Sequence, residues 1–256
     1  KISELMGALN SIVFAPEDLR IIKEAPSLRR RMMDMELCKI SPGYYRSLQS
    51  YSLALKSKNK LLKNPRADAG VLSAYSEQMA AYGEQMIVER AAFVEQLNAC
   101  TARFYHNLQG ISEGIEIRYK CSAEVENARE SLLAKMQANA AREREMGVCL
   151  TGPHREDLEI LINGRDSKIY ASQGQQRSAV LSLKLAQLEW AGQESGEAPI
   201  LMLDDVMSEL DPNRRRQLIE RIDRVQTFVT CTDLSDLAGA KQGAVYRVEK
   251  GELKRI

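Results

Sequence analysis

The stretch PILMLDDVMSELDP, Pro199 to Pro212, runs four apolar residues directly into two adjacent carboxylates. The apolar run predicts a short buried strand. It is followed by a helical segment over residues 212–225 and by a second apolar run, QTFVTCTD, over residues 226–233. This strand, helix, strand order predicts a parallel pair with a right-handed crossover. The sequence therefore predicts an α/β fold that places one of the two acids at the carboxyl edge of the sheet, where open sheets bind ligands.

A second segment, SQGQ from Ser172 to Gln175, lies directly before a long apolar-periodic helix. Ser172 can cap that helix by accepting from N–H groups of the first turn. The small residues can equally admit a phosphate to the free N–H groups and the positive end of the helix dipole. The two aspartates also have a simpler explanation, since Asp commonly follows strands in turns. Because both segments occur in one chain, a shared phosphate-binding site is favoured over a helix cap and a turn that are unrelated to each other.

Composition limits the function classes. The 256 residues hold 36 Lys plus Arg against 35 Asp plus Glu, so any contact with nucleic acid must come from local patches. The five cysteines are scattered and form no CxxC pair, which argues against a disulfide framework and a zinc site and fits a reducing cytoplasm. No run of about 18 apolar residues and no signal peptide is present, so neither a membrane span nor secretion is expected.

Residues 16–110 read almost wholly as helices, with Pro16, Pro26 and Pro42 at predicted helix starts. Apolar residues between Gly70 and Gly110 recur mostly every three or four positions, with Arg90 interrupting the stripe. This predicts a long helix packed along a preceding one, with a turn at Asn64-Pro65. The predicted stripe of the long helix is Leu72, Tyr75, Met79, Tyr82, Met86, Phe93, Leu97, Phe104 and Leu108, and the facing stripe is Tyr45, Leu48, Leu55 and Leu62.

The character changes after Gly110. A strand is predicted over residues 115–121, one charged helix over 123–147, a hairpin over 157–171 turning at Asn163-Gly164, and a closing hairpin over 244–256. We therefore divide the chain into an end segment of an α/β body (1–15), a helical arm (16–110) and the C-terminal part of that body (111–256).

These segments together resemble the C-terminal half of ABC-type ATPases, a class that includes the SMC and RecF families. SQGQ resembles the signature loop, with Gln173 where many members have Gly; residues 200–205 resemble the Walker B strand, and residues 208–211 the D-loop that follows it. APEDL (15–19), GPHREDL (152–158) and the segment from Ser172 to Ala186 extend the resemblance to the bacterial RecF family, over essentially the whole chain. The fold it implies is an incomplete ABC-type ATPase body with a long helical arm.

The resemblance also implies roles. Asp204 would hold Mg²⁺ through water, and Asp205 would orient or deprotonate the attacking water in ATP hydrolysis. Most ABC-type ATPases have Glu at the second position, so the shorter Asp205 implies slow hydrolysis. Ser172, Gln173, Gly174 and Gln175 would bind the γ-phosphate of a nucleotide held mainly by the partner subunit of an ATP-dependent homodimer, and Ser208 and Asp211 belong to the D-loop.

Two departures from the pattern stand out. No GxxxxGK[ST] loop occurs in the sequence; RecF-like proteins carry it near the N-terminus, and because the chain also begins without Met we expect a fragment that does not hydrolyse ATP alone. The usual switch His after the last core strand is missing, and Thr230 and Thr232 stand in its place. His154 and Arg155 are candidate nucleotide or DNA contacts, with a structural hydrogen-bonding role the equal alternative for both.

Cations cluster in the arm of this otherwise neutral chain, and we take them as candidate DNA contacts: Arg29, Arg30, Arg31, Lys56, Lys58, Lys60, Lys63 and Arg66. A solvated helix face is the simpler explanation for any one of them, but several together can bind a phosphate backbone. Few aromatic residues lie among them, so duplex binding without sequence readout is favoured over stacking on single strands. The arginines of NRRRQ (213–217) are predicted to lie on a helix surface beside the D-loop.

The function that the resemblance implies is that of a recombination mediator, a slow ATPase that dimerises with ATP and clamps duplex DNA near single-strand gaps. It would act in repair with RecR and RecO to help RecA load. One alternative is a DNA- or partner-binding module without catalysis, which the missing phosphate loop favours for the chain alone. An SMC-like structural ATPase is a third hypothesis, although the arm is too short for the long coiled coils of that family.

Overall fold

A three-stranded parallel sheet of order β1–β5–β6 forms one end of the structure, a computed structural model that describes residues 10–109, 113–222, 225–240 and 243–256. β5 (Ile200–Asp204) pairs in parallel with β6 (Thr227–Thr230), and α10 (Pro212–Ile222) lies between them in sequence, as predicted. β1 (Ser11–Phe14) pairs in parallel with the other edge of β5 and was not predicted. Residues 1–9 and the predicted boundary at Gly110 lie outside the described residues.

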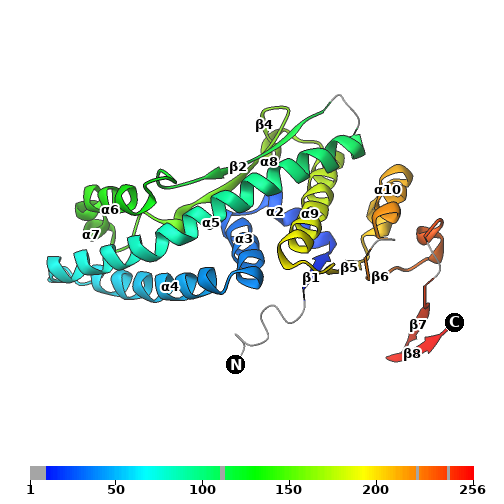
Figure 1. The fold of residues 1–256 in the computed structure, drawn as a ribbon, viewed down its shortest axis with the longest axis horizontal. Helices are drawn as coiled ribbons and strands as arrows, with labels where there is room; N and C mark the ends of the chain where they lie inside the picture. Colours follow the sequence, from blue (N-terminus) through cyan, green and yellow to red (C-terminus); the bar gives the residue numbers. More distant parts are fainter. Residues whose placement is uncertain (1–9, 110–112, 223–224, 241–242) are drawn as a thin grey trace.

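The long helix α9 (Gln173–Ser195) joins this sheet to the arm (Figure 1). It begins at Ser172 with a capping box and ends at Gly196, whose positive φ of 72° closes the last turn. Most of its middle residues are buried, because it packs against β1 on one side and the arm on the other. Trp190 meets Phe93 of the arm edge-on, with ring centroids 4.6 Å apart.

The arm consists of η1 (Pro16–Leu19), α2 (Arg20–Lys23), α3 (Pro26–Ile40), α4 (Pro42–Leu62) and α5 (Ala69–Gln109). Proline stands at each predicted helix start, where its missing N–H costs nothing. α5 lies along α4 and continues past it to contact α9 and β2 (Ile115–Lys120), so one helix spans the length of the arm (Figure 1). The predicted α/β class with a long helical arm is confirmed.

The predicted stripes on α4 and α5 are partly wrong. On α4 the buried face holds Tyr44, Tyr51, Ala54 and Leu62, while Tyr45, Leu48 and Leu55 are only half-buried. The buried face also contains Ser47 and Lys58, whose partners Gln85 and Glu143 come from elsewhere in the chain. On α5, Tyr82 is exposed and Arg90 is 1% exposed. Apolar spacing misplaced the contact face because polar residues take part in it.

A second sheet of order β2–β3–β4 covers the other side of α5. β2 is antiparallel to β3 (Asp157–Ile162), and Asn163 and Gly164 turn the chain with φ of 50° and 73°. β4 (Arg165–Asp166) is shorter than predicted, because α8 (Ser167–Tyr170) follows at once. The predicted helix over 123–147 is two helices, α6 (Ala128–Ala138) and α7 (Ala140–Met146), broken at Asn139, whose amide donates to Lys135 O and Thr151 Oγ1.

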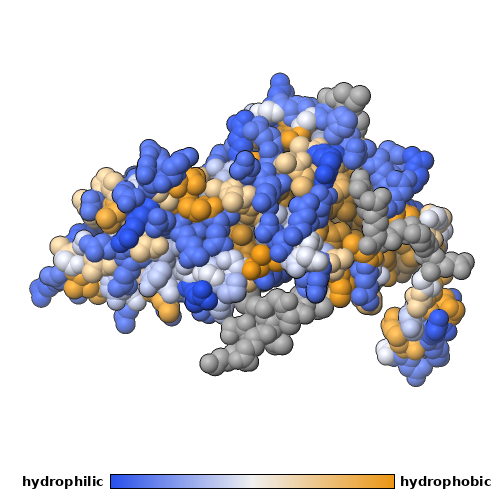
Figure 2. All heavy atoms as spheres, viewed as in Figure 1, coloured by the Kyte–Doolittle hydropathy of each residue, from blue (hydrophilic) through white to orange (hydrophobic). Residues whose placement is uncertain are grey.

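Three short 3-10 helices connect these elements: η2 (Pro153–Arg155), η3 (Met207–Glu209) and η4 (Leu234–Leu237). The predicted closing hairpin is β7 (Tyr246–Glu249) and β8 (Glu252–Arg255), and all eight of its strand residues are exposed. Tyr246, Val248 and Leu253 are exposed on it, and Figure 2 shows orange, hydrophobic atoms on this hairpin. No helix in the described part of the chain is long and apolar enough to cross a membrane.

The buried ion pair of Lys58 and Glu143 holds α4 to α7, with 2.7 Å between Nζ and Oε2. We predict that Lys58→Met lowers the free energy of unfolding by about 3–5 kcal/mol, because it leaves the Glu143 carboxylate buried without a cation. Lys60→Met, on the exposed side of the same helix, is the matched control and should change it by less than about 0.5 kcal/mol. Urea denaturation measures both, and equal losses would show that the pair does not stabilise the arm.

Candidate functional site

Asp204, Asp205 and Thr230 lie together where β5 and β6 end. The Thr230 hydroxyl donates to Asp204 Oδ1 at 2.7 Å, and Asp205 N donates to Thr230 Oγ1 at 3.0 Å. Both carboxylates are exposed. Thr230 therefore fixes the position of both acids, and one of the two residues that replace the expected switch His contacts them directly. Thr232 is exposed and has no hydrogen bond to any described residue.

Asp205 adopts a left-handed backbone conformation with φ of 52°. Asp tolerates this region better than most residues, but the conformation still costs free energy and needs support from its neighbours. That support comes from Ser208, whose hydroxyl is 3.1 Å from Asp205 O and 3.3 Å from Asp205 Oδ1. The turn directs Asp205 away from the strand, and the serine of the predicted D-loop holds it there.

The two carboxylates suit Mg²⁺, which is usually bound by one or two carboxylates and keeps several waters. Asp204 has its Oδ2 free of any described hydrogen bond, and both acids face solvent. Among the described residues no group of three or more His, Cys, Asp or Glu could form a closed metal site. The donor set therefore fits a cation shared with water and phosphate and does not fit a structural zinc ion.

The N-terminus of α9 is open to solvent. Ser172 Oγ accepts from Gln175 N at 3.2 Å, and Gln175 Oε1 accepts from Ser172 N at 2.8 Å, so the segment is a true capping box. Ser172 and Gln173 are exposed, and Gly174 is half-buried. The N–H groups of Gln173 and Gly174 have no intrahelical acceptor, as at any helix start. The cap leaves two N–H donors available, so capping and an anion site are compatible at this helix start.

The Gln175 side chain also connects this helix start to the end of the arm. Its Nε2 donates to Glu113 Oε1 at 2.9 Å, and Glu113 Oε2 accepts from the buried Tyr105 hydroxyl at 3.0 Å. Burial, together with Glu113, raises the pKa of Tyr105, so the hydroxyl stays a donor. Neither Glu113 nor Tyr105 was predicted as part of the site. No motif marked them, since Glu113 lies 62 residues before Gln175 in the chain and only the fold brings the two together.

The D-loop aspartate caps α10. Asp211 Oδ1 accepts from Asn213 N and Arg214 N, and its Oδ2 pairs with Arg214 Nη1 at 2.6 Å. The Arg214 guanidinium lies beside Gly174 of the signature-like loop. The structure therefore brings Ser172–Gln175 and Ser208–Asp211 close to one another within one chain, and the residue that connects them is Arg214. Of the arginines of 213–217, which were predicted to lie on a helix surface beside the D-loop, Arg216 is exposed, whereas Arg214 and Arg215 are half-buried, with 18% and 24% of their side chains exposed.

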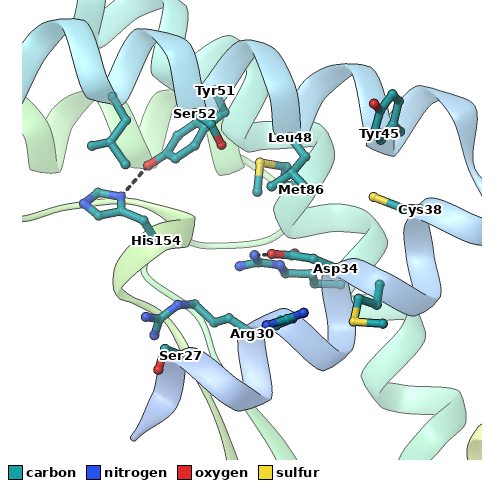
Figure 3. Close-up of a pocket in the computed structure, with 14 residues that line it drawn as sticks. Ser27, Arg30, Asp34, Cys38, Tyr45, Leu48, Tyr51, Ser52, Met86 and His154 are labelled. Atoms are coloured by element: carbon teal, nitrogen blue, oxygen red, sulfur yellow. Dashed lines mark hydrogen bonds and ion pairs between the residues drawn. The ribbon is translucent and has the colours of Figure 1, made fainter. Parts of the chain in front are cut away.

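His154 occupies a structural position. Its Nδ1 accepts from the Tyr51 hydroxyl at 2.6 Å (Figure 3), and its Nε2 faces Cys149 O at 3.3 Å. Burial lowers its pKa from 6.5 to about 4, and the charges of Arg155, Arg30 and Lys58 act in the same direction. Arg155 donates to the same carbonyl through Nε and Nη2. Both side chains bind the protein itself, which favours the structural alternative over contact with nucleotide or DNA.

A cavity of about 500 Å³ opens between α3 and α4, next to His154 (Figure 3). Arg30, Arg31 and Asp34 line it together with apolar residues of both helices. Asp34 Oδ1 is paired with Arg90 Nη2 at 2.7 Å, and Arg30 Nη1 donates to Glu156 O at 2.7 Å. The cavity belongs to the arm and not to the sheet edge that carries Asp204.

The structure separates the candidate DNA-binding cations into two groups. Arg29 forms a buried bidentate pair with Asp157 and donates to Ile21 O, and Lys58 is buried against Glu143. The prediction that these two contact DNA is wrong, because neither charge reaches the surface. Arg30 is half-buried. The remaining candidates are exposed, namely Arg31, Lys56, Lys60, Lys63 and Arg66, and the last three lie at or near the tip of the arm.

Known proteins match the chain over its whole length. The DNA replication and repair protein RecF of Clostridium botulinum (strain ATCC 19397 / Type A) is 41% identical over 261 residues, which cover 100% of this chain and 72% of that protein. The chain belongs to the RecF family. RecF of Symbiobacterium thermophilum is 42% identical over 256 residues, covering 97% of this chain and 68% of that protein. No protein-family model matches the chain.

Solved RecF structures share this fold. The structure described as the recombination mediator protein RecF-ATPrS in the RecFOR pathway superposes with a TM-score of 0.90 at 35% identity, covering 100% of this chain and 70% of that one. The corresponding RecF-ATP structure gives 0.88 at 34% identity, covering 99% of this chain and 69% of that one. An Smc head domain from Pyrococcus furiosus, covering 96% of this chain and 61% of that one, matches with a TM-score of 0.54 at 13% identity, which shows a similar fold alone. The predicted resemblance to RecF is confirmed.

The low pKa of His154 makes the stability of this RecF-family chain depend on pH. Between about pH 6.5 and 4 the unfolded chain binds a proton at this residue that the folded chain does not. The free energy of unfolding therefore falls as the pH is lowered through this window, by up to about 3 kcal/mol. His154→Gln removes the titratable ring while offering an amide acceptor and an amide donor, and it should reduce the loss; the exposed His106→Gln is the control. Denaturant titrations at several pH values compare the free energy of unfolding of the three proteins. The same decrease at low pH in all three would contradict the assignment of this pH dependence to His154.

Proposed function

We propose that the chain is the arm and the signature-loop part of a recombination mediator that dimerises with ATP, hydrolyses it slowly and binds duplex DNA near single-strand gaps. The observation that carries the proposal is the grouping of Asp204, Asp205 and Thr230 at the strand ends, with an open helix start at Ser172. Membership in the RecF family supports the same assignment.

In this proposal Asp204 holds Mg²⁺ through water, and the cation neutralises phosphate charge when it is bound. Asp205 orients the attacking water and accepts its proton, because its carboxylate projects from the strand end and is held by Ser208. Thr230 gives the two aspartates different hydrogen bonds. Its hydroxyl donates to the Asp204 carboxylate and accepts from the Asp205 backbone N–H, so the Asp205 carboxylate is not engaged by Thr230. Asp205 reaches one methylene less far than Glu, which accounts for slow turnover.

Ser172 and the free N–H groups of Gln173 and Gly174 bind the γ-phosphate of ATP held mainly by the partner copy. Gly174 leaves room for that phosphate because it presents no side chain, and the dipole of α9, a helix of 23 residues, favours a negative charge at this end. Each ATP thus joins two copies of the protein. Its hydrolysis removes the phosphate that both copies contact and releases the dimer.

In this proposal the protein acts in the cytoplasm with RecR and RecO, and the outcome is the loading of RecA. Solved RecF structures are described as belonging to the RecFOR pathway, which supports this setting. The exposed cations along the second half of α4 supply the duplex contact, since Lys56, Lys60 and Lys63 repeat at helical spacing on one side of the helix.

A binding module without catalysis is the second candidate, and the specific observation in its favour is that no GxxxxGK[ST] loop occurs in the 256 residues. The Asp204–Asp205 pair favours the ATPase, since a module that never hydrolyses ATP has no need of a strained carboxylate beside a phosphate site.

Asp205→Asn tests the catalytic assignment in the full-length protein. We expect it to lower the single-turnover rate of ATP hydrolysis at least 100-fold while ATP affinity stays within twofold, since an amide cannot accept the proton. Asn also tolerates the positive φ of this position, so the backbone is preserved. The matched variant Asp204→Asn should chiefly weaken affinity for Mg²⁺ and ATP. Normal hydrolysis by Asp205→Asn would show that another residue orients the attacking water. A wild-type protein that does not hydrolyse ATP would favour the binding module without catalysis.

Removing three arm charges together tests the DNA contact. The variant Lys56→Gln/Lys60→Gln/Lys63→Gln should bind duplex DNA more weakly and with a smaller salt dependence, because each lost phosphate contact lowers the slope of log K against log salt by about 0.9. Fluorescence anisotropy at several salt concentrations measures both quantities. Lys168→Gln, exposed on α8 and outside the cluster, is the control. An unchanged slope would place the DNA on another surface.

A further inference from the structure

Arg214 has an unusual position for a residue in the first turn of a helix. Its side chain is 18% exposed, and Asp211 fixes it through its backbone N–H and through Nη1. Arg216, two residues further along, is exposed and contacts only Asn213 Oδ1 among the described residues. Of the three consecutive arginines, Arg215 pairs with Asp236, Arg216 is exposed, and Arg214 is the one whose guanidinium lies beside Gly174.

The inward guanidinium lies against the start of α9. A Cβ placed on Gly174 would be 3.6 Å from Arg214 Nη2 and 3.8 Å from Nη1. Because Gly174 has no side chain, the guanidinium and the helix N-terminus, with its free N–H groups, lie side by side. Two sources of positive potential, a full charge and a helix dipole, thus meet at one point in a single chain.

Part of the donor capacity of Arg214 is unused. Its Nε is buried and has no hydrogen-bond partner among the described residues, and Nη2 also donates to no described acceptor. Buried charged donors are normally paired, and an exception asks for a ligand or water that completes the site. The Asp211 carboxylate engages only one nitrogen, which leaves part of the guanidinium fork free to bind an acceptor with several oxygens.

We propose that Arg214 is a phosphate-binding residue that acts together with Ser172 and Gly174 on the γ-phosphate of the nucleotide held by the partner copy. This inference rests on the function proposed above and adds to it a residue outside the signature and D-loop segments. Asp211 orients the guanidinium, so the D-loop and the signature loop bind one phosphate as a unit. The charge of Arg214 also favours ATP over ADP in the dimer, because only ATP places a phosphate there.

The test is sedimentation velocity of the full-length protein with Mg²⁺ and either ATP or ADP. Arg214→Ala should weaken the ATP-dependent dimer about tenfold or more, leave ATP affinity of the monomer unchanged, and leave the unfolding midpoint without nucleotide within about 2 °C. Arg214→Lys keeps the charge but not the planar fork, so the affinity of its ATP-dependent dimer should lie between that of Arg214→Ala and that of wild type. Arg216→Ala is the control and should dimerise as wild type does.

Gly174→Ala separates failure of the inference from failure of the proposed function. Its methyl group meets Arg214 at an ordinary contact distance, so the variant should fold, but the methyl group obstructs the phosphate. If Gly174→Ala loses the ATP-dependent dimer and Arg214→Ala keeps it, the role of Arg214 is refuted and the proposed function stands. If the wild-type protein forms no ATP-dependent dimer, or if Gly174→Ala dimerises equally well, the proposed function is refuted and the inference with it. A fall in the nucleotide-free unfolding midpoint of Arg214→Ala without a selective loss of the ATP dimer would show a merely structural role.

Discussion

The arrangement of the arm depends on the buried guanidinium of Arg90. Its nitrogens donate to Tyr44 Oη on α4, Asp34 on α3, and Pro153 O and Glu156 beside η2. A buried cation is costly unless its donors find partners, so the packing that brings these four partners together is favoured. Burial raises the pKa of Tyr44 and Tyr119, and their hydroxyls therefore remain protonated and donate to Asp34 and Glu156.

The same helices that carry this network also reach the candidate nucleotide site. α5 packs against α9, where Phe93 meets Trp190, and the end of α5 approaches Gln175 through Tyr105 and Glu113. The helix whose N-terminus would bind phosphate is therefore fixed in part by the arm. Cations near the tip of the arm and the start of α9 belong to one packed unit, which gives a physical route between the DNA contact and the nucleotide contact that we propose.

Sequence predicted the features that local chemistry decides. The helix starts at Pro26 and Pro42, the Asn163-Gly164 turn and the parallel strands around α10 follow from backbone preferences and apolar runs. The sequence pattern did not indicate β1, a four-residue strand that pairs with β5 far away in the chain. Apolar spacing also assigned the wrong residues to the contact face of α4. Both errors have one cause: a short strand or a buried polar residue is defined by partners that lie far away in sequence.

By itself the sequence determined the α/β class, the family resemblance and the identity of the carboxylates at the end of β5, because these depend on consecutive residues. Only the tertiary structure decided which charged residues are available. Arg29 and Lys58 read as surface cations but are buried in ion pairs, whereas Arg214 read as helix surface and turns toward Gly174. Charge is a property of the residue, but its exposure and its partner are set by packing, since a charge can be buried only where the fold supplies the opposite charge.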